Sequence, residues 1–308
     1  MTRDVSIHDG SGVGLGPGSL SRLQHWAADP SLVVSDGRFF VYPTSDGYPG
    51  WSSGAFHVYS SSDLNQWTDE GEVLRLGRDV RWAQTRAWAP AVLVAEDRWV
   101  LFYTAEGGFI GVATAHLPTG PFVDIGKPLI SPGSWPGTAI DPSTFCDLDG
   151  KTYLIWGNGV LNIAALNEDL ISFDASQVVS SCPQGFTEAG FIHRRKSVYY
   201  LSWSSNDTRS PDYSVWYATG SSPLGPWTFR GPLLRKDEPR GVLGTGHHCI
   251  VQLPGTDQWL IGYHAFAPGS DGYHRAVRFD WLTHRADGLL DEVVPGDAAR
   301  PNIPALRR

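Results

Sequence analysis

Cysteine and long hydrophobic runs are scarce in this 308-residue sequence. Its three cysteines, Cys146, Cys182 and Cys249, are an odd number at wide spacings, which excludes a disulfide framework and paired metal-ligand spacing. We expect them to be thiols of the core. No stretch of about 18 apolar residues occurs, and residues 1–20 lack the apolar region of a signal peptide. The sequence therefore predicts no membrane partner and a cytoplasmic location, or an exported one if a leader has been removed.

Positive charge is also in short supply. Lysine and arginine number 24 against 32 aspartates and glutamates, which gives a net charge of −8, and no basic run occurs. A protein that binds a phosphate backbone needs the opposite balance. We therefore expect no nucleic-acid partner.

Glycine and proline, by contrast, are abundant, with 35 and 22 residues. Both interrupt helices and mark turns, so this composition predicts an all-β protein. The chain also holds 13 tryptophans and 11 tyrosines, more than packing needs. Flat rings with one polar edge commonly line concave sugar sites, so the aromatic content is a first hint of a carbohydrate ligand.

A loose repeat of about 50 residues runs through the chain. In each unit a β-branched or aromatic run meets a polar turn, and an aromatic-rich run follows, which is a hairpin signature. The five hairpins are DPSLVVSDGRFFVYPTS from Asp29, APAVLVAEDRWVLFYTA from Ala89, DPSTFCDLDGKTYLIWG from Asp141, EAGFIHRRKSVYYLSW from Glu188 and HHCIVQLPGTDQWLIGYH from His247. A second half, which runs through a turn to an aromatic and a closing strand, recurs at residues 60–74, 113–130, 164–179 and 218–234.

Four strands in each of five units predict a five-bladed β-propeller with four-stranded antiparallel blades. The alternative is a pair of β-sandwiches. A sandwich pair would not show a matched fivefold pattern, and no Pro/Ser-rich linker divides the chain. We expect a flexible N-terminal leader at residues 1–20 and a single propeller domain, which would also carry any catalytic site, at residues 21–308.

The propeller geometry selects a candidate site. The first strand of every blade lines the central axis, so the residues that lead these strands meet at one mouth of the channel. The leading residues are Asp29, Ala89, Asp141, Glu188 and His247. Carboxyl groups gathered in a partly desolvated cavity raise at least one pKa, which is useful in catalysis. The alternative for any single aspartate is a turn-capping role, since Asp-Pro is an ordinary strand-entry turn.

A zinc site is not expected at His247-His248-Cys249, because adjacent strand residues point to opposite faces. The chain does, however, resemble a known family. The similarity extends from Trp26 to Val294 and is carried by ADPSLV, TSDGYPGW, SSDLNQWTDEG, AWAPAV, PTGPFVD, IDPSTF, EAGFIHRR and GTGHHCIV in this order. These motifs resemble those of the family 43 glycoside hydrolases, five-bladed propellers that act on arabinose- and xylose-containing glycans. The sequence departs from the family at Glu188-Ala189-Gly190, where Glu-Gly-Pro is common.

The resemblance implies roles for the three acids. Asp29 would be the general base that activates water, and Glu188 the general acid. Asp141 would keep the pKa of that acid high and orient its carboxyl group. Such a pair of carboxyl groups fits an inverting glycosidase, since hydrolysis needs an acid on the leaving oxygen and a carboxylate opposite it.

Four further residues are candidates for the same site. Trp51 and Trp88 would form apolar walls for a sugar ring, and Arg275 would reach a hydroxyl group. The resemblance implies no required cofactor but allows a structural calcium ion in the channel beside His247, held through water. Plain packing is the alternative for the two tryptophans and Arg275, and a hydrogen-bonded core histidine is the alternative for His247.

The leading hypothesis is an exo-acting α-L-arabinofuranosidase or β-xylosidase whose partner is an oligo- or polysaccharide. A β-D-galactofuranosidase of the same fold is the alternative enzyme, because its substrate has a furanose ring of similar shape. A non-catalytic glycan-binding propeller is the alternative from another class, which the presence of all three acids disfavours. The sequence contains no feature that specifies an oligomeric state.

Overall fold

The structure is a computed structural model, and it describes residues 23, 26–270 and 272–296. The predicted leader at residues 1–20 lies outside the described residues. Within them, regular structure is almost entirely β-strand, and the helices are the short 3-10 segments Pro49–Trp51, Ala175–Gln177 and Glu238–Arg240. None of the helices in the described ranges is long and apolar enough to cross a membrane.

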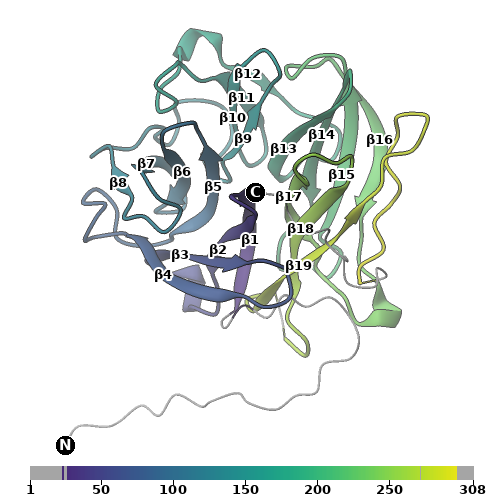
Figure 1. Cartoon of the computed structure of the whole chain (residues 1–308), viewed down its shortest axis with the longest axis horizontal. Coiled ribbons are helices and arrows are strands. Elements are labelled where there is room, and N and C mark those ends of the chain that lie inside the picture. The colour runs from purple at the N-terminus through teal and green to yellow at the C-terminus, as the bar shows by residue number, and fades with distance from the viewer. Residues whose placement is uncertain (1–22, 24–25, 271, 297–308) are drawn as a thin grey trace, which may run out of the picture.

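Five antiparallel sheets stand around a common centre and form a five-bladed β-propeller (Figure 1). The predicted fold is therefore confirmed, and in every blade neighbouring strands follow chain order. The strands of the first four blades are β1 (Ala27–Ser35), β2 (Arg38–Ser45), β3 (Ala55–Ser61) and β4 (Thr68–Arg75); β5 (Trp88–Val94), β6 (Trp99–Ala105), β7 (Phe109–Ala115) and β8 (Val123–Asp124); β9 (Ser143–Cys146), β10 (Thr152–Trp156), β11 (Leu161–Ala165) and β12 (Val179–Ser181); and β13 (Glu188–Arg195), β14 (Val198–Ser205), β15 (Ser214–Gly220) and β16 (Trp227–Leu234).

The fifth blade differs from the prediction of four strands. Within the described residues it contains three, β17 (Gly246–Gln252), β18 (Trp259–Phe266) and β19 (Arg275–Leu282). The chain after β19 crosses to the fourth blade instead of pairing with β19. There the Val293 N–H donates to the Leu233 carbonyl at 2.7 Å, beside the outer strand β16. The last segment thus covers an edge of the neighbouring blade.

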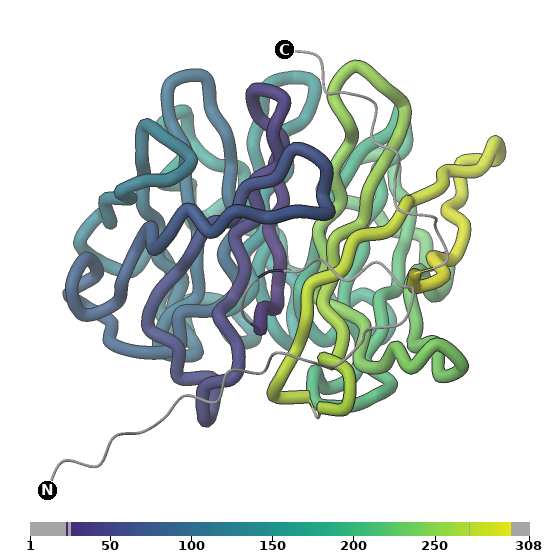
Figure 2. Tube along the Cα trace, turned by 60° about the horizontal axis from the view of Figure 1, so that its bottom comes forward, coloured from purple at the N-terminus to yellow at the C-terminus, as the bar shows by residue number. Residues whose placement is uncertain are grey.

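The ring closes where the first blade meets the fifth. Strand β1 packs against β17, β18 and β19, and Figure 2 shows the purple N-terminal strand running beside the yellow-green strands of the last blade. Chain segments more than 200 residues apart therefore lie side by side at this junction. Groups on the first and last blades can share one site.

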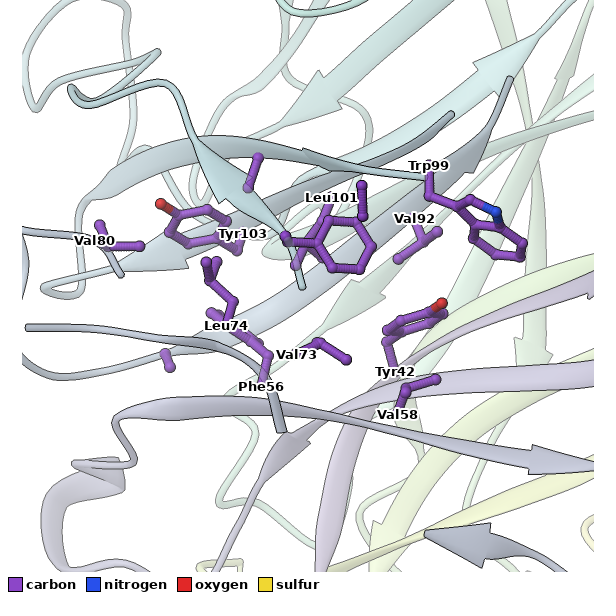
Figure 3. Packing of buried hydrophobic residues seen from close by; sticks show 14 of the residues in the cluster. Tyr42, Phe56, Val58, Val73, Leu74, Val80, Val92, Trp99, Leu101 and Tyr103 are labelled. Atoms are coloured by element: carbon purple, nitrogen blue, oxygen red, sulfur yellow. The ribbon is translucent and has the colours of Figure 1, made fainter. Parts of the chain in front are cut away.

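The apolar cores lie between neighbouring blades, and each of the five clusters of buried residues combines side chains from two adjacent blades. Every residue of β6, β10 and β18 is buried. Such continuous burial requires the near-continuous apolar runs in these strands, since both faces of a blade pack against a neighbour. Figure 3 shows one of these cores, in which Tyr42 and Phe56 of the first blade contact Leu101 and Tyr103 of the second.

The cysteine prediction was wrong for two of the three residues. Cys249 on β17 is buried, but Cys146 and Cys182 are exposed. Cys146 ends β9 on the side that faces outward, and Cys182 directly follows β12, the outermost strand of its blade. A small thiol is tolerated both in the core and at the surface, so its burial depends on where its strand lies in the blade.

All five first strands carry the same backbone kink. One residue at the start of each adopts a positive φ, which side chains other than glycine rarely do. These residues are Asp29 (φ 48°), Ala89 (43°), Asp141 (57°), Ala189 (55°) and His247 (41°). In four blades the pairing register with the second strand also shifts at this point. The kink turns the leading side chains toward the axis, and strain of this kind is typical of functional sites.

Four of the kinks face a side chain of the preceding blade, and three of them are held by a hydroxyl that accepts the main-chain N–H. The kinked residue's main-chain N–H points at a side chain on the second strand of that blade; we call these contacts interblade latches. They join the N–H of Ala89 to Thr44 Oγ1 at 2.7 Å, of Asp141 to Thr104 Oγ1 at 3.0 Å, of His247 to Ser204 Oγ at 2.8 Å and of Asp29 to His264 Nδ1 at 3.4 Å. At the remaining junction the corresponding residue is Gly157, which follows β10 and has no side chain that could accept the N–H of Ala189.

Candidate active site

One pocket at the kinked ends of the first strands contains every residue that the sequence singled out. Its cavity volume is about 590 Å³, within the usual range for small-molecule sites. The predicted residues that line it are Asp29, Trp51, Trp88, Asp141, Glu188, His247 and Arg275. Asn158, Ile140 and residues 206–209 complete the walls.

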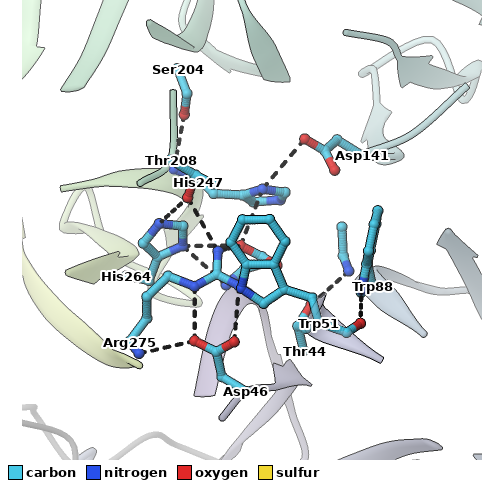
Figure 4. Close-up of polar contacts among 12 residues, drawn as sticks. Thr44, Asp46, Trp51, Trp88, Asp141, Ser204, Thr208, His247, His264 and Arg275 are labelled. Atoms are coloured by element: carbon cyan, nitrogen blue, oxygen red, sulfur yellow. Dashed lines mark hydrogen bonds and ion pairs between the residues drawn. The ribbon is translucent and has the colours of Figure 1, made fainter. Parts of the chain in front are cut away.

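Three of the leading side chains come from equivalent kinks. The imidazole Nδ1 of His247 lies 3.4 Å from Asp29 Oδ1 and 3.6 Å from Asp141 Oδ2. Figure 4 shows His247 in the middle of this group, with Asp141 on one side. Burial lowers the pKa of His247 to about 4, although the Asp29 charge opposes that shift. The imidazole is therefore neutral near pH 7.

Glu188 is not equivalent to these three residues, contrary to the sequence alignment of the blades. The fourth kink lies at Ala189, so Glu188 stands one residue earlier. It pairs with Ser204, as Trp88 pairs with Thr104 in the second blade. Because successive strand residues point in different directions, the Glu188 side chain leaves its strand one position before the kink, and it still lines the same pocket.

Asp29 is held as a carboxylate. It is 6% exposed, and its Oδ1 lies 3.0 Å from His264 Nδ1 and 3.2 Å from Arg275 Nη1. Burial alone would raise the pKa of Asp29, but the Arg275 charge, His247 and the hydrogen bond with His264 together hold it well below its usual value. An ionised carboxylate at this position can accept a proton.

Glu188 has the opposite tendency. Burial raises the pKa of its carboxyl group, and the nearby Asp29 charge adds to the rise. Two hydrogen bonds oppose it: Tyr213 donates to Oε1 at 2.6 Å and Asn158 Nδ2 donates to Oε2 at 2.8 Å. Since these donors favour the ionised form, the net shift is a balance between burial and hydrogen bonding.

Asp141 titrates together with Glu188. Burial raises the pKa of Asp141 well above its usual value, and the charges of Glu188 and Asp29 raise it further. The main-chain N–H of Ala189 donates to the Asp141 carboxylate and partly opposes this rise. Groups that interact so closely release protons as a pair. The ionisation of Glu188 therefore raises the pKa of Asp141, whereas the sequence suggested a permanently charged neighbour.

Arg275 is anchored from three sides. Its Nε lies 2.9 Å from Asp46 Oδ2, its Nη2 3.2 Å from Asp46 Oδ1, and its Nη1 3.3 Å from Thr208 Oγ1. Its guanidinium also lies 5.6 Å from the ring centre of Trp51. Figure 4 shows the Asp46 carboxylate joined to Arg275 by dashed lines. The guanidinium is fixed beside Asp29, where it stabilises negative charge.

Aromatic rings form one wall. Trp51 meets Trp88 edge to face, with ring centres 6.4 Å apart, and lies 5.0 Å from Tyr273. The Trp88 indole N–H donates to the Trp51 carbonyl at 2.6 Å. The short 3-10 segment Pro49–Trp51, with positive φ at Gly50 and Trp51, turns the Trp51 ring inward. A rigid apolar wall of this kind suits the face of a sugar ring.

The residues around His247 do not fit a calcium ion. Calcium takes six to eight oxygen ligands, whereas His247 offers a nitrogen and the nearby Asp29 carboxylate is already paired with Arg275 and His264. No group of three or more His, Cys, Asp or Glu side chains in the described residues could hold a metal ion.

Sequence reasoning missed several residues that hold these groups in place. They are Asp46, Asn158, Thr208, Tyr213 and His264. Asp46 lies inside the motif TSDGYPGW, so position in a motif could have suggested it. His264 could have been found because it ends the fifth hairpin, near the position that Thr44 and Thr104 hold in their hairpins. Tyr213 and Asn158 lie in loops without a matching repeat.

Comparisons with known proteins agree with this geometry. The family model described as glycosyl hydrolases family 43 matches residues 23–290. An arabinoxylan arabinofuranohydrolase of Bacillus subtilis is 32% identical over 92% of the chain, and the chain spans only 65% of that relative's length. A β-D-galactofuranosidase of Aspergillus niger is 28% identical, covering 88% of the chain and 82% of the relative. The crystal structure of an α-L-arabinofuranosidase from Clostridium thermocellum superposes with a TM-score of 0.74 at 32% identity, covering 88% of this chain and 95% of that one.

Proposed function

The chain belongs to the glycosyl hydrolases of family 43, and from this premise we propose that it is an inverting glycosidase. Its substrates are terminal arabinofuranosyl or xylosyl residues of oligo- or polysaccharides. The names of its relatives support these sugars. The burial of Asp29 and Asp141, each 6% exposed, supports exo action, because a sugar has to enter the pocket end-on to reach them.

The opposite pKa directions of two carboxyl groups in one pocket carry this proposal. Asp29 stays ionised because Arg275, His247 and His264 outweigh its burial, and it acts as the general base toward water. Glu188 holds a proton to higher pH because it is buried, and it acts as the general acid toward the leaving oxygen. Attack by water on the face opposite the leaving group inverts the anomeric configuration.

The remaining residues support these two steps. Asp141 keeps the acid protonated, because the ionisation of either carboxyl group disfavours that of the other. Arg275 stabilises the charge of Asp29 and stands where it can donate to a sugar hydroxyl. Trp51 and Trp88 exclude water from one side of the ring. No cofactor is assigned to the reaction.

A β-D-galactofuranosidase is the second candidate, since a relative with that name covers 88% of the chain. The test is a panel of nitrophenyl α-L-arabinofuranoside, β-D-xylopyranoside and β-D-galactofuranoside, with Asp29→Asn as the control for background hydrolysis. Preferred turnover of the first or second substrate is expected. Preference for the third would favour the second candidate, and turnover of none would favour a non-catalytic glycan-binding protein.

A further inference from the structure

The latch between the fifth and first blades differs from the other three. Thr44, Thr104 and Ser204 accept the main-chain N–H through a hydroxyl at 2.7–3.0 Å. At the last junction the imidazole of His264 takes the place of the hydroxyl, and its Nδ1 is 3.4 Å from the Asp29 nitrogen. The same Nδ1 lies closer to the Asp29 carboxylate, 3.0 Å from Oδ1. At this junction the closer contact of the latch residue is therefore with the side chain of the kinked residue and not with its main-chain N–H.

The surroundings of His264 favour a neutral ring that donates to Asp29. The side chain is fully buried, and burial together with the Arg275 charge lowers its pKa. Its Nε2 lies 3.4 Å from the Thr208 hydroxyl, which can donate to it. With Nε2 as acceptor, the proton of the neutral ring belongs on Nδ1, toward the carboxylate of Asp29.

A second aromatic ring connects this histidine to Glu188. Tyr213 stacks on His264 with ring centres 5.5 Å apart and an interplanar angle of 7°. It is fully buried, and its hydroxyl donates to Glu188 Oε1 at 2.6 Å. Gly246, which pairs with His264, makes room for this ring, because a Cβ there would lie 2.1 Å from a Tyr213 carbon.

We propose that the stacked His264–Tyr213 pair is a positioning unit that holds the carboxyl groups of Asp29 and Glu188 in a fixed relation across the ring closure. One ring bonds each carboxyl group, and the stack fixes the rings against each other. The unit joins the first, fifth and fourth blades. The inference rests on the proposed function, in which these two groups are the base and the acid.

Other groups also act on the two carboxyls. Arg275 on β19, His247 on β17 and Asp141 before β9 face Asp29. Asn158, Asp141, Arg275 and Asp29 act on Glu188. Removing one ring therefore changes one interaction among several, and the two carboxyls are expected to respond separately.

The test uses His264→Thr and Tyr213→Phe. Threonine restores the hydroxyl latch of the first two blades but no longer donates to the Asp29 carboxylate. The pKa of Asp29 should therefore rise, and the acid limb of the kcat/KM profile should move to higher pH. Phenylalanine keeps the stack but removes a hydrogen-bond donor that favours ionised Glu188. The pKa of Glu188 should therefore rise, and the alkaline limb of the profile should move to higher pH. We expect a loss in kcat of roughly tenfold to hundredfold in each, with little change in KM.

Carboxyl ¹³C NMR titration reads both pKa values without activity, with the signals assigned from Asp29→Asn and Glu188→Gln. Thr44→Ala is the control, since it removes a latch that touches neither carboxyl, and it should move neither pKa. The double variant should lose less than the sum of the single losses, because the rings act together.

Unchanged pKa values in both single variants, with kcat altered no more than in Thr44→Ala, would overturn the inference and leave His264 as a latch alone. Should His264→Thr fail to fold, Tyr213→Phe and His264→Asn, which keeps a donor without the stack, decide the question. A wild-type protein inactive on every glycoside would refute the proposed function, whereas the titration would still test the positioning unit.

Discussion

Asp29 and Glu188 hold their protons differently although both carboxyl groups are buried in one pocket. Asp29→Asn and Glu188→Gln each remove a proton-transfer partner without changing side-chain volume. We expect each to lower kcat by about 100- to 10,000-fold, with a melting temperature near that of the wild type. Near-wild-type turnover by either variant in a nitrophenyl glycoside assay would contradict its assigned role. A dinitrophenyl substrate, whose leaving group needs little protonation, should rescue Glu188→Gln more than Asp29→Asn.

Asp141 combines a charge with a backbone contact, and two variants separate them. Asp141→Asn removes the charge that disfavours ionised Glu188, but its amide oxygen can still accept the Ala189 N–H. The pKa of Glu188 should fall, so the alkaline limb of the pH–rate profile should move to lower pH. Asp141→Ala should lower the melting temperature as well. An alkaline limb unmoved in Asp141→Asn would show that the two groups are not coupled.

At the scale of the elements, the latches join neighbouring blades at every junction except that of the third and fourth. Thr44→Ala leaves the buried N–H of Ala89 without its partner and should lower the free energy of unfolding by about 1–3 kcal/mol. Thr44→Ser keeps the hydroxyl and is the control. Gly157→Ala should also destabilise rather than add a latch, because a Cβ there would lie 1.9 Å from the Val160 carbonyl oxygen. Urea titrations of the three variants measure these differences, and equal stability of Thr44→Ala and wild type would refute the latch.

The junction of the fourth and fifth blades also contains a histidine pair. The Nε2 atoms of His193 and His284 lie 3.0 Å apart. Burial lowers the pKa of His193 well below 6.5 and, with the Arg195 charge, that of His284 to about 4. The unfolded chain therefore binds more protons between pH 6.5 and about 4, and stability that is present above pH 6.5 is lost as the pH falls through this window.

The matched variant for this pair is His284→Gln. It keeps hydrogen-bonding capacity but does not titrate, so the melting temperature should fall less steeply between pH 6.5 and about 4, the window set by the ordinary and the lowered pKa of His284. Thermal unfolding at several pH values measures the slope. The same slope in variant and wild type would mean that other groups cause the acid sensitivity.

For the molecule as a whole, Arg275 and Asp46 form a buried ion pair that closes the ring around the site. They lie 229 positions apart in the chain, and the guanidinium is 5% and the Asp46 carboxylate 0% exposed. Asp46→Ala removes the main partner of a buried cation and should lower the free energy of unfolding by about 3–5 kcal/mol. Asp287→Ala breaks an exposed pair with Arg285 and should change it by less than about 1 kcal/mol. Equal losses in the two variants would contradict the importance of ring closure.

The sequence by itself determined the all-β class, the five blades and the acids, because strand patterning and turn residues are local and recur in each unit. It could not determine the offset of Glu188 from the other leading residues. That offset depends on where the backbone kinks in three dimensions, and the fourth kink lies at Ala189. Nor could the sequence determine that the fifth blade has three strands within the described residues, because the pairing of the segment around Val293 with the fourth blade is a tertiary contact. Only the closed ring brings His264 and Tyr213 between Asp29 and Glu188, because contacts over such sequence distances leave no local pattern.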